Sequence, residues 1–329
     1  MKPKDRIELS IRGELSSTPA VLPLIGAHSA VIFNANVHKA FTDGKLMADL
    51  QTKVAELYKP DGIFHYMDLT VEAEALGAKI QFRGHFPAVV EHHIPEEPEF
   101  DESKGRIRHF IRAVRLLNER VGNELFIGAY VTGPLTLAFE LLGSRDVVRW
   151  LAGKGGIVGD LLPRLTKFIS EYAKALIDNG AEGVMVLEPC CALASPKMFR
   201  SVISFINETC TTIRARGAIP FLHICGDVTH LLPLLHEVEA LVYQIDSMVD
   251  LRRAREAIPD KCLMGNIDTS LLLRGGIREI VEAVRKCISY MDARRYILSA
   301  GCEIPPRTPP EHLKAMISEA RRKSKNGRG

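Results

Sequence analysis

The feature that most constrains the fold is a regular alternation of short apolar segments with longer amphipathic ones. Helical periodicity fills the intervals between the apolar segments. Strand–helix alternation along a whole chain favours parallel pairing, and eight such units favour a closed (β/α)8 barrel, so we expect a TIM barrel. The eight apolar segments have the length and composition of buried strands: 18–26, 62–68, 125–131, 183–187, 218–225, 240–245, 262–266 and 296–299.

Two segments lie outside this alternation. Residues 5–12 predict a short helix ahead of the first strand, which makes an N-terminal helical extension. Residues 80–104 have little helical periodicity and contain three prolines, so we expect a small extended excursion such as a hairpin. Barrels of this kind often reach 329 residues as one domain, and we expect a single domain over 1–329.

Composition limits the partners and the compartment. The net charge is only +3, the basic residues are spread along the chain and there is one Trp, which argues against nucleic acid. No apolar run is long enough to cross a bilayer, so we expect no membrane span. The seven cysteines do not form a disulfide framework and no secretion signal is visible, which together predict a reduced, cytoplasmic protein.

Polar residues follow the predicted strands at the points where they end. The carboxyl ends of parallel strands meet on one rim, and barrels of this kind build their active sites there. A scattered set of core residues would not all fall at this rim, so we expect a functional site among them. The residues are His28, Asp68, Thr132, Glu188, His223, Cys225, Asp246, Asn266 and Cys302.

Three of these residues have the chemistry of a zinc site. His223 and Cys225 are two apart, so on an extended backbone their side chains share one face. Imidazole and thiolate suit zinc, and Cys302, after the apolar run 296–298, is a candidate third ligand. Three protein ligands leave a fourth position open, which is typical of a catalytic zinc. The alternative is a buried structural cysteine beside a hydrogen-bonded histidine.

The carboxylates at the rim allow more than one role. Glu188 is a candidate fourth ligand, a base that takes a proton from a substrate thiol, or a structural cap on the helix after Pro189. Asp246 and Asp68 are candidates for orienting His223 or the substrate, because zinc-bound histidines usually need a hydrogen-bond acceptor. The alternative for both is an ordinary hydrogen-bonded carboxylate.

Five motifs then indicate a family. Leu222-His223-Ile224-Cys225-Gly226-Asp227, the segments 301–309, 67–77 and 131–138, and Gly265-Asn266-Ile267-Asp268 resemble the corrinoid-dependent methyltransferases that methylate coenzyme M. These enzymes belong to the uroporphyrinogen decarboxylase superfamily. The motifs are spread from about residue 5 to 320. The resemblance implies a TIM barrel and a zinc bound by His223, Cys225 and Cys302.

The resemblance also implies a reaction and its partners. A small thiol such as coenzyme M takes the methyl group of a corrinoid, which is carried on a separate corrinoid protein. The rim residues His28, Thr132 and Asn266 are then candidates for binding the cofactor. The sulfonate of coenzyme M would favour a basic residue at the rim, and Arg307 is a candidate. Some members move methyl groups from small donors onto cobalt, so the direction stays open.

Two alternatives remain. Uroporphyrinogen decarboxylase needs no metal and neutralises the carboxylates of its substrate with basic residues. Its Arg-Gln-Ala-Gly-Arg signature should follow the first strand, where this chain has Leu24-Ile25-Gly26-Ala27-His28-Ser29-Ala30, although Asp68 matches its pyrrole-binding aspartate. The second alternative is a barrel that binds zinc or a thiol without catalysis.

Overall fold

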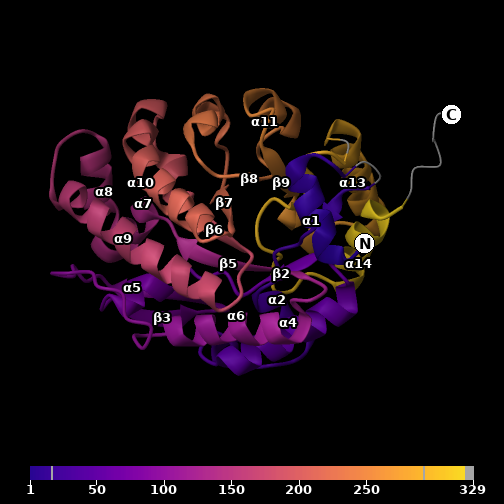
Figure 1. The fold of residues 1–329 in the computed structure, drawn as a ribbon, viewed down its shortest axis with the longest axis horizontal. Coiled ribbons are helices and arrows are strands. Elements are labelled where there is room, and N and C mark those ends of the chain that lie inside the picture. The colour runs from indigo at the N-terminus through magenta and orange to yellow at the C-terminus, as the bar shows by residue number, and fades with distance from the viewer. Residues whose placement is uncertain (16–17, 292, 323–329) are drawn as a thin grey trace.

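Eight parallel strands form a nearly closed barrel surrounded by helices (Figure 1). The computed structural model describes residues 1–15, 18–291 and 293–322. The predicted (β/α)8 barrel is confirmed, and its strands pair in the order β1-β10-β9-β8-β7-β6-β5-β2. The strands are β1 (Ala20–Val21), β2 (Gly62–Phe64), β5 (Phe126–Thr132), β6 (Gly183–Leu187), β7 (Ile219–Ile224), β8 (Val242–Ile245), β9 (Cys262–Ile267) and β10 (Tyr296–Ala300).

Helices cover the outside of the barrel (Figure 1). The predicted helix at 228–236 is a 3₁₀ helix, η2 (Thr229–Glu237), because Pro233 within it cannot donate an α-helical hydrogen bond. The longer helices are α4 (Gly44–Tyr58), α6 (Ile107–Val121), α7 (Pro134–Leu142), α8 (Ser144–Leu151), α9 (Ile157–Asp178), α10 (Pro196–Ala215), α13 (Ile277–Met291) and α14 (Pro310–Ala320). The shorter ones are α2 (Ala27–Ile32), α3 (Val37–Ala40), α5 (Val71–Ala75), η1 (Pro189–Leu193), α11 (Leu251–Ala257) and α12 (Thr269–Arg274).

The seam between β1 and β2 is closed by one residue. Asp61 donates its main-chain N–H to the carbonyl of Val21 (2.9 Å), and its carboxylate accepts from the Val21 N–H (2.7 Å). Arg6 and Arg321 both reach the same carboxylate, at 3.4 and 3.3 Å. Asp61 therefore links the first strand, the second strand and both ends of the described chain.

Helix α1 (Pro3–Arg12) closes the N-terminal end of the barrel. Its Lys4 N–H donates to the carbonyl of Glu124, just before β5, and Arg295, just before β10, donates to its Ile11 carbonyl. Ile7 is completely buried against the barrel interior. The predicted N-terminal extension thus seals one end and leaves the carboxyl ends of the strands for a site.

Inward-facing side chains fill the barrel. Phe64, Phe126 and Phe221 pack together, and Gly128 makes room for them, since a Cβ there would lie 2.4 Å from the Phe64 ring. Because side chains on a strand alternate, His223 shares the inward face of Phe221. Strand β7 therefore points both Phe221, a core residue, and His223, a polar residue, toward the barrel axis.

The predicted excursion is an antiparallel hairpin, β3 (Lys79–Arg83) and β4 (Phe86–Glu91). It turns at Gly84, whose φ of +64° favours glycine. Its Phe82 ring stacks on His38 with centroids 4.3 Å apart, which holds the hairpin against the barrel.

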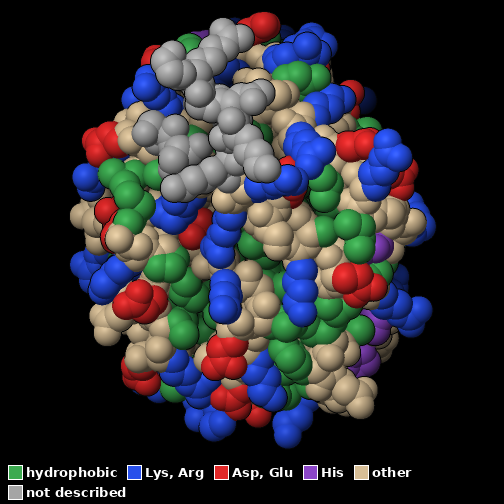
Figure 2. Space-filling view, turned by 90° about the vertical axis from the view of Figure 1, so that its right-hand side faces the viewer, with side chains coloured by type: hydrophobic (Ala, Val, Ile, Leu, Met, Phe, Trp, Pro, Cys, Tyr) green, Lys and Arg blue, Asp and Glu red, His purple; other side chains and the backbone are tan. Residues whose placement is uncertain are grey.

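The molecular surface has mixed charge on the face seen in Figure 2, where Lys and Arg side chains are interspersed with acidic and apolar ones over the described residues. None of the helices in the described part of the chain has both the length and the apolar character to span a bilayer.

Candidate metal centre at the barrel rim

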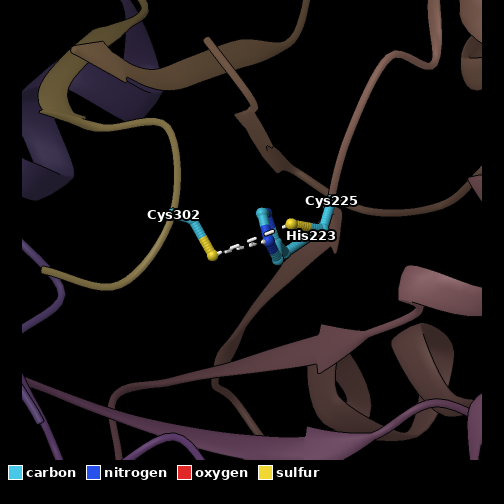
Figure 3. Close-up of side chains that lie close together, drawn as sticks. All are labelled: His223, Cys225 and Cys302. Atoms are coloured by element: carbon cyan, nitrogen blue, oxygen red, sulfur yellow. Dashed lines mark hydrogen bonds between the residues drawn. The ribbon is translucent and has the colours of Figure 1, made fainter. Parts of the chain in front are cut away.

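Three soft donors meet at the carboxyl ends of two strands. His223 is on β7, Cys225 follows that strand directly, and Cys302 follows β10. In the sheet order β8 and β9 lie between β7 and β10, so the group spans part of the barrel mouth. Figure 3 shows the Cys302 side chain pointing toward the other two. All ligand atoms lie within 4.8 Å of one another.

The donor spacing fits a tetrahedral zinc. The two Sγ atoms are 3.8 Å apart, and Cys302 Sγ lies 3.6 Å from His223 Nε2. With Zn–S near 2.3 Å and Zn–N near 2.0 Å, tetrahedral geometry separates two sulfur atoms by about 3.8 Å and a sulfur from a nitrogen by about 3.5 Å. Both cysteines are partly exposed, so a further ligand can reach the group from solvent. The two distances and the 4.8 Å limit on all three donor atoms are therefore compatible with three ligands of one ion.

The two thiols share a proton unequally. Hydrogen bonding with Cys302, and then with His223, lowers the pKa of the Cys225 thiol to about 5. The same contact, together with burial, raises the pKa of Cys302 well above its usual value. Without a metal the pair therefore holds one thiolate at neutral pH, and thiolate is the form that ligates zinc.

Asp246 lies beside the cluster. Its Oδ2 accepts the Gly226 N–H at 2.9 Å and is 3.4 Å from Cys225 Sγ. Gly226 has a φ of +91°, which glycine tolerates, so the loop turns sharply to bring its amide to this carboxylate. Asn266 donates its side-chain N–H to the carbonyls of Asp246 (3.0 Å) and Val249 (2.8 Å). Asp246 therefore positions the Cys225 loop, and Asn266 anchors the loop that carries Asp246.

The second nitrogen of His223 has no partner. Its Nδ1 is buried without a hydrogen bond, and so is Oε1 of Gln244, which pairs with His223 in the β7–β8 register. Gln244 is held by its Nε2, which donates to the Ala300 carbonyl at 3.1 Å. A histidine that ligates metal through Nε2 carries a proton on Nδ1 and needs an acceptor there. Sequence reasoning missed Gln244, although a lone polar residue between Tyr243 and Ile245 was a usable signal.

Glu188 is turned toward helix α7. Its Oε1 accepts the Leu135 N–H (2.9 Å), and its Oε2 accepts the Thr136 N–H (3.1 Å) and hydroxyl (2.8 Å). Burial raises its pKa to about 7 against these hydrogen bonds. Gly133 makes the contact possible, because a Cβ there would lie 2.2 Å from Glu188 Cγ. The carboxylate caps the N-terminus of α7 rather than the turn after Pro189.

Thr132 is held by a buried carboxylate. Its N–H and hydroxyl donate to the two oxygens of Glu72, at 2.7 and 2.9 Å. Burial raises the pKa of Glu72 to about 7. His28 is likewise satisfied within the chain, by the Tyr58 hydroxyl (2.8 Å) and the Pro306 carbonyl (3.2 Å), and burial lowers its pKa to about 4. The structure gives all these atoms partners within the chain.

Asp68 forms a buried ion pair with Arg106, whose guanidinium also binds Glu74 at 2.5 Å. The Asp68 and Arg106 side chains are 0% and 6% exposed. The second Asp68 oxygen accepts from the N–H and hydroxyl of Thr70, at 2.8 and 2.7 Å. Asp68 lies at the rim, but its charge is already neutralised there.

The sequence analysis did not include Glu303, the residue after Cys302, among the candidate site residues. Its Oε1 is buried without a hydrogen-bond partner, and burial raises the pKa of the carboxyl to about 8. A Cβ at Gly26 would lie 1.7 Å from this oxygen, so the glycine makes the space that the carboxyl occupies. Its place inside the motif after Cys302 was the available signal.

Comparison with known proteins gives the family. The uroporphyrinogen decarboxylase (URO-D) model matches residues 2–323, so the chain belongs to this family. A methylcobamide:CoM methyltransferase MtbA of Methanosarcina mazei is 26% identical over 298 residues, 86% of each chain. A methylcobamide:CoM methyltransferase MtaA of Methanosarcina barkeri is 26% identical over 293 residues, 85% of each chain.

A solved structure shares the fold. The chain superposes on a methyltransferase from Methanosarcina mazei with a TM-score of 0.88 at 23% identity, covering 97% of this chain and 98% of the other. The fold of this chain is therefore shared, over nearly its whole length, with a solved structure.

Proposed function

We propose that this protein is a methyltransferase that moves a methyl group between a corrinoid, carried by a partner protein, and a small thiol such as coenzyme M. The observation that carries the proposal is the His223, Cys225 and Cys302 cluster, whose spacing matches three ligands of one tetrahedral ion. The similarity to methylcobamide:CoM methyltransferases supports the same reaction class.

The ion that fits the cluster best is zinc. When bound, zinc would hold the substrate thiol as a thiolate, the nucleophilic form. Cys225 and Cys302 supply two negative charges, which keep the centre electron-rich, and Asp246 fixes the loop that carries Cys225. In the direction toward thiol, a sulfur–carbon bond forms, the cobalt–carbon bond breaks with its electron pair left on the corrinoid, and the thiol proton leaves to solvent.

One carboxylate at the rim acts on the metal cluster, and another acts only on the fold. Asp246 is the carboxylate nearest the cluster, 3.4 Å from Cys225 Sγ, and we assign it to positioning. Glu188 uses both oxygens on helix α7, so we assign it to capping and not to proton transfer. His28, Thr132 and Asn266 shape the rim through their hydrogen bonds to the chain and do not present free polar atoms to a corrinoid.

The test is methyl transfer from methylcobalamin to a thiol by the zinc-loaded protein, followed by the loss of the methyl–cobalt absorption and by thioether formation. We expect Cys225→Ala to abolish transfer and zinc binding together, and Cys210→Ala, a buried cysteine on α10, to keep both. Glu188→Gln should retain zinc and turnover. Absence of transfer from the zinc-loaded wild type, with uroporphyrinogen decarboxylated instead, would show that the chain is on the decarboxylase branch of the family.

A further inference from the structure

Two of the seven cysteines differ from the rest in exposure and spacing. Cys225 and Cys302 are partly exposed, whereas the other five are buried. Their Sγ atoms lie 3.8 Å apart, and Figure 3 shows the two side chains turned toward each other. We call Cys225 and Cys302 the rim pair. It is the place in the described residues where two neighbouring thiols are both accessible to a small molecule.

The rim pair is also close to the geometry of a disulfide. A disulfide bond is about 2.0 Å long, so the gap closes if each sulfur moves by about 0.9 Å. Neither cysteine is held within a strand, because Cys225 follows β7 and Cys302 follows β10. A glycine adjoins each of them, Gly226 after Cys225 and Gly301 before Cys302. Rotation of the two side chains and small shifts of these loops can therefore form the bond while the strands stay paired.

The remaining cysteines lack this reactivity. Cys190 and Cys191 are consecutive, but both are buried. Burial raises the pKa of Cys190, Cys210 and Cys262 to about 12, and that of Cys191 well above its usual value. These thiols stay protonated at neutral pH, and a protonated thiol does not attack a disulfide. Thiol–disulfide exchange should therefore be confined to the rim pair.

We propose that the rim pair is a redox modification site, which in the metal-free chain forms one intrachain disulfide by exchange with a small disulfide. In the first step, one rim sulfur bonds to a sulfur of the small disulfide and releases one small thiol. In the second step, the other rim sulfur displaces the second small thiol. Two cysteine thiols are oxidised, one small disulfide is reduced to two thiols, and the two cysteine protons pass to the released thiols.

The disulfide would switch off the metal centre. It removes both thiolate donors and leaves His223 as the remaining member of the ligand set. Zinc binds thiolates, so the oxidised chain should not hold the ion. This consequence rests on the proposed function and adds regulation to it. If the substrate is a small thiol, that thiol also reduces the rim pair, so the centre assembles only while the thiol is in excess over its disulfide.

The direct test is exchange of the full metal-free chain with 2-hydroxyethyl disulfide, with a chelator present and oxygen excluded. We expect two of the seven thiols to be lost, and trypsin to release one linked product of the peptides 217–252 and 296–307, each of which carries one cysteine. Cys210→Ala should give the same product. Cys225→Ala should stop at a mixed disulfide between Cys302 and the probe. Retention of all the thiols in the wild type, or a wild type that stops at the mixed disulfide, overturns the proposal.

Two further readouts connect the modification to the metal. Zinc held at about ten times its Kd should slow the exchange about tenfold, since only the metal-free fraction reacts. In chelator competition, the oxidised chain should bind zinc at least about 100-fold more weakly until 2-mercaptoethanol reduces it. Unchanged zinc affinity in the oxidised chain would show that the disulfide does not control the metal centre.

Failure of this inference and failure of the proposed function give different results. If the reduced, zinc-loaded protein methylates thiols but the rim pair never links at any ratio of disulfide to thiol, the modification site is wrong while the methyltransferase stands. If the disulfide forms reversibly and blocks zinc but no thiol is methylated, the modification site stands and the methyltransferase fails.

Discussion

The two sides of the barrel rim treat their polar residues in opposite ways. Around β2, β5 and β6, each carboxylate is saturated by the chain: Glu188 by the start of α7, Glu72 by Thr132, and Asp68 by Arg106. At β7 and β10 the donors contact mainly one another: the two thiols are partly exposed, and the second imidazole nitrogen of His223 is buried without a hydrogen bond. Satisfied groups stabilise the fold, and unsatisfied ones are available to a ligand.

The largest expected contrast is in metal content. Cys302→Ala leaves two of the three donors, so we expect zinc to fall from about one per chain to less than about a tenth of that. Far-ultraviolet circular dichroism should not change, since the barrel core does not depend on one ion. The matched control, Cys210→Ala, should keep its zinc. Full occupancy in Cys302→Ala, by elemental analysis, would show that the cluster is not the site.

The next effect belongs to the saturated side. Asp68→Asn leaves the buried Arg106 charge with only Glu74, and breaking a buried pair costs about 3–5 kcal/mol of unfolding free energy. Zinc content should not change. Chemical denaturation measures the loss, and Glu91→Gln, which breaks the exposed pair with Lys79, is the control with little expected effect. A stable Asp68→Asn protein that loses zinc would remove the distinction between the two sides.

A smaller effect on zinc affinity tests the buried polar atoms that have no hydrogen bond, His223 Nδ1 and Gln244 Oε1. Gln244→Leu removes the acceptor that lies beside His223 in the sheet register, and we expect zinc affinity to fall about 10–100-fold, as for other groups that orient metal ligands. Ser299→Ala removes a buried, unpartnered hydroxyl on β10 and should change the affinity less. Competition with a chromophoric chelator gives both constants. Equal losses in the two variants would mean that Gln244 does not orient His223.

The smallest effect is a difference in pH response. The pKa values of Glu72 and Glu188 are about 7 in the folded protein, above the ordinary value of a glutamate, so between these values the folded state binds more protons than the unfolded state. The contribution of these two carboxyls to the unfolding free energy of the metal-free protein should therefore be greatest at the low-pH end of this window. It should fall as pH rises toward 7, by roughly 1 kcal/mol per group for each pH unit.

Zinc affinity should change in the other direction over the same window, because the ligand thiols must lose their protons. Denaturation curves between pH 5 and 8, and chelator competition at each pH, measure the two trends. Glu188→Gln should reduce the slope of stability without altering that of zinc affinity. An equal pH slope of stability in the wild type and in Glu188→Gln would contradict the raised pKa of Glu188.

The strands of the barrel and their ends could be predicted from the sequence because they depend on local patterns of residues. Each strand is an apolar run that ends at a glycine or polar residue, and the period of two places His223 and Cys225 together without knowledge of the rest. Cys302 became a candidate because it too follows an apolar run, 296–298, and the ends of parallel barrel strands meet on one rim. The structure brings the three together, while zinc binding stays a prediction.

The partners of the carboxylates could not be predicted in the same way. Glu188 meets Leu135 and Thr136 about fifty residues earlier in the chain, and Asp68 meets Arg106 across a loop and a hairpin. No local pattern distinguishes a carboxylate that caps a distant helix from one that faces substrate.

The seam at Asp61 has a consequence for biosynthesis. Val21 in β1 takes its ladder partner from Leu298 in β10, and Asp61 receives Arg321 from beyond the last helix. At about 5–20 residues per second, the ribosome makes the first strand some tens of seconds before the strand that pairs with it. Strand β1 therefore has no β10 strand to pair with until synthesis is nearly complete. Pulse proteolysis of ribosome-stalled chains should show protection of β1 only after residue 300 has left the exit tunnel.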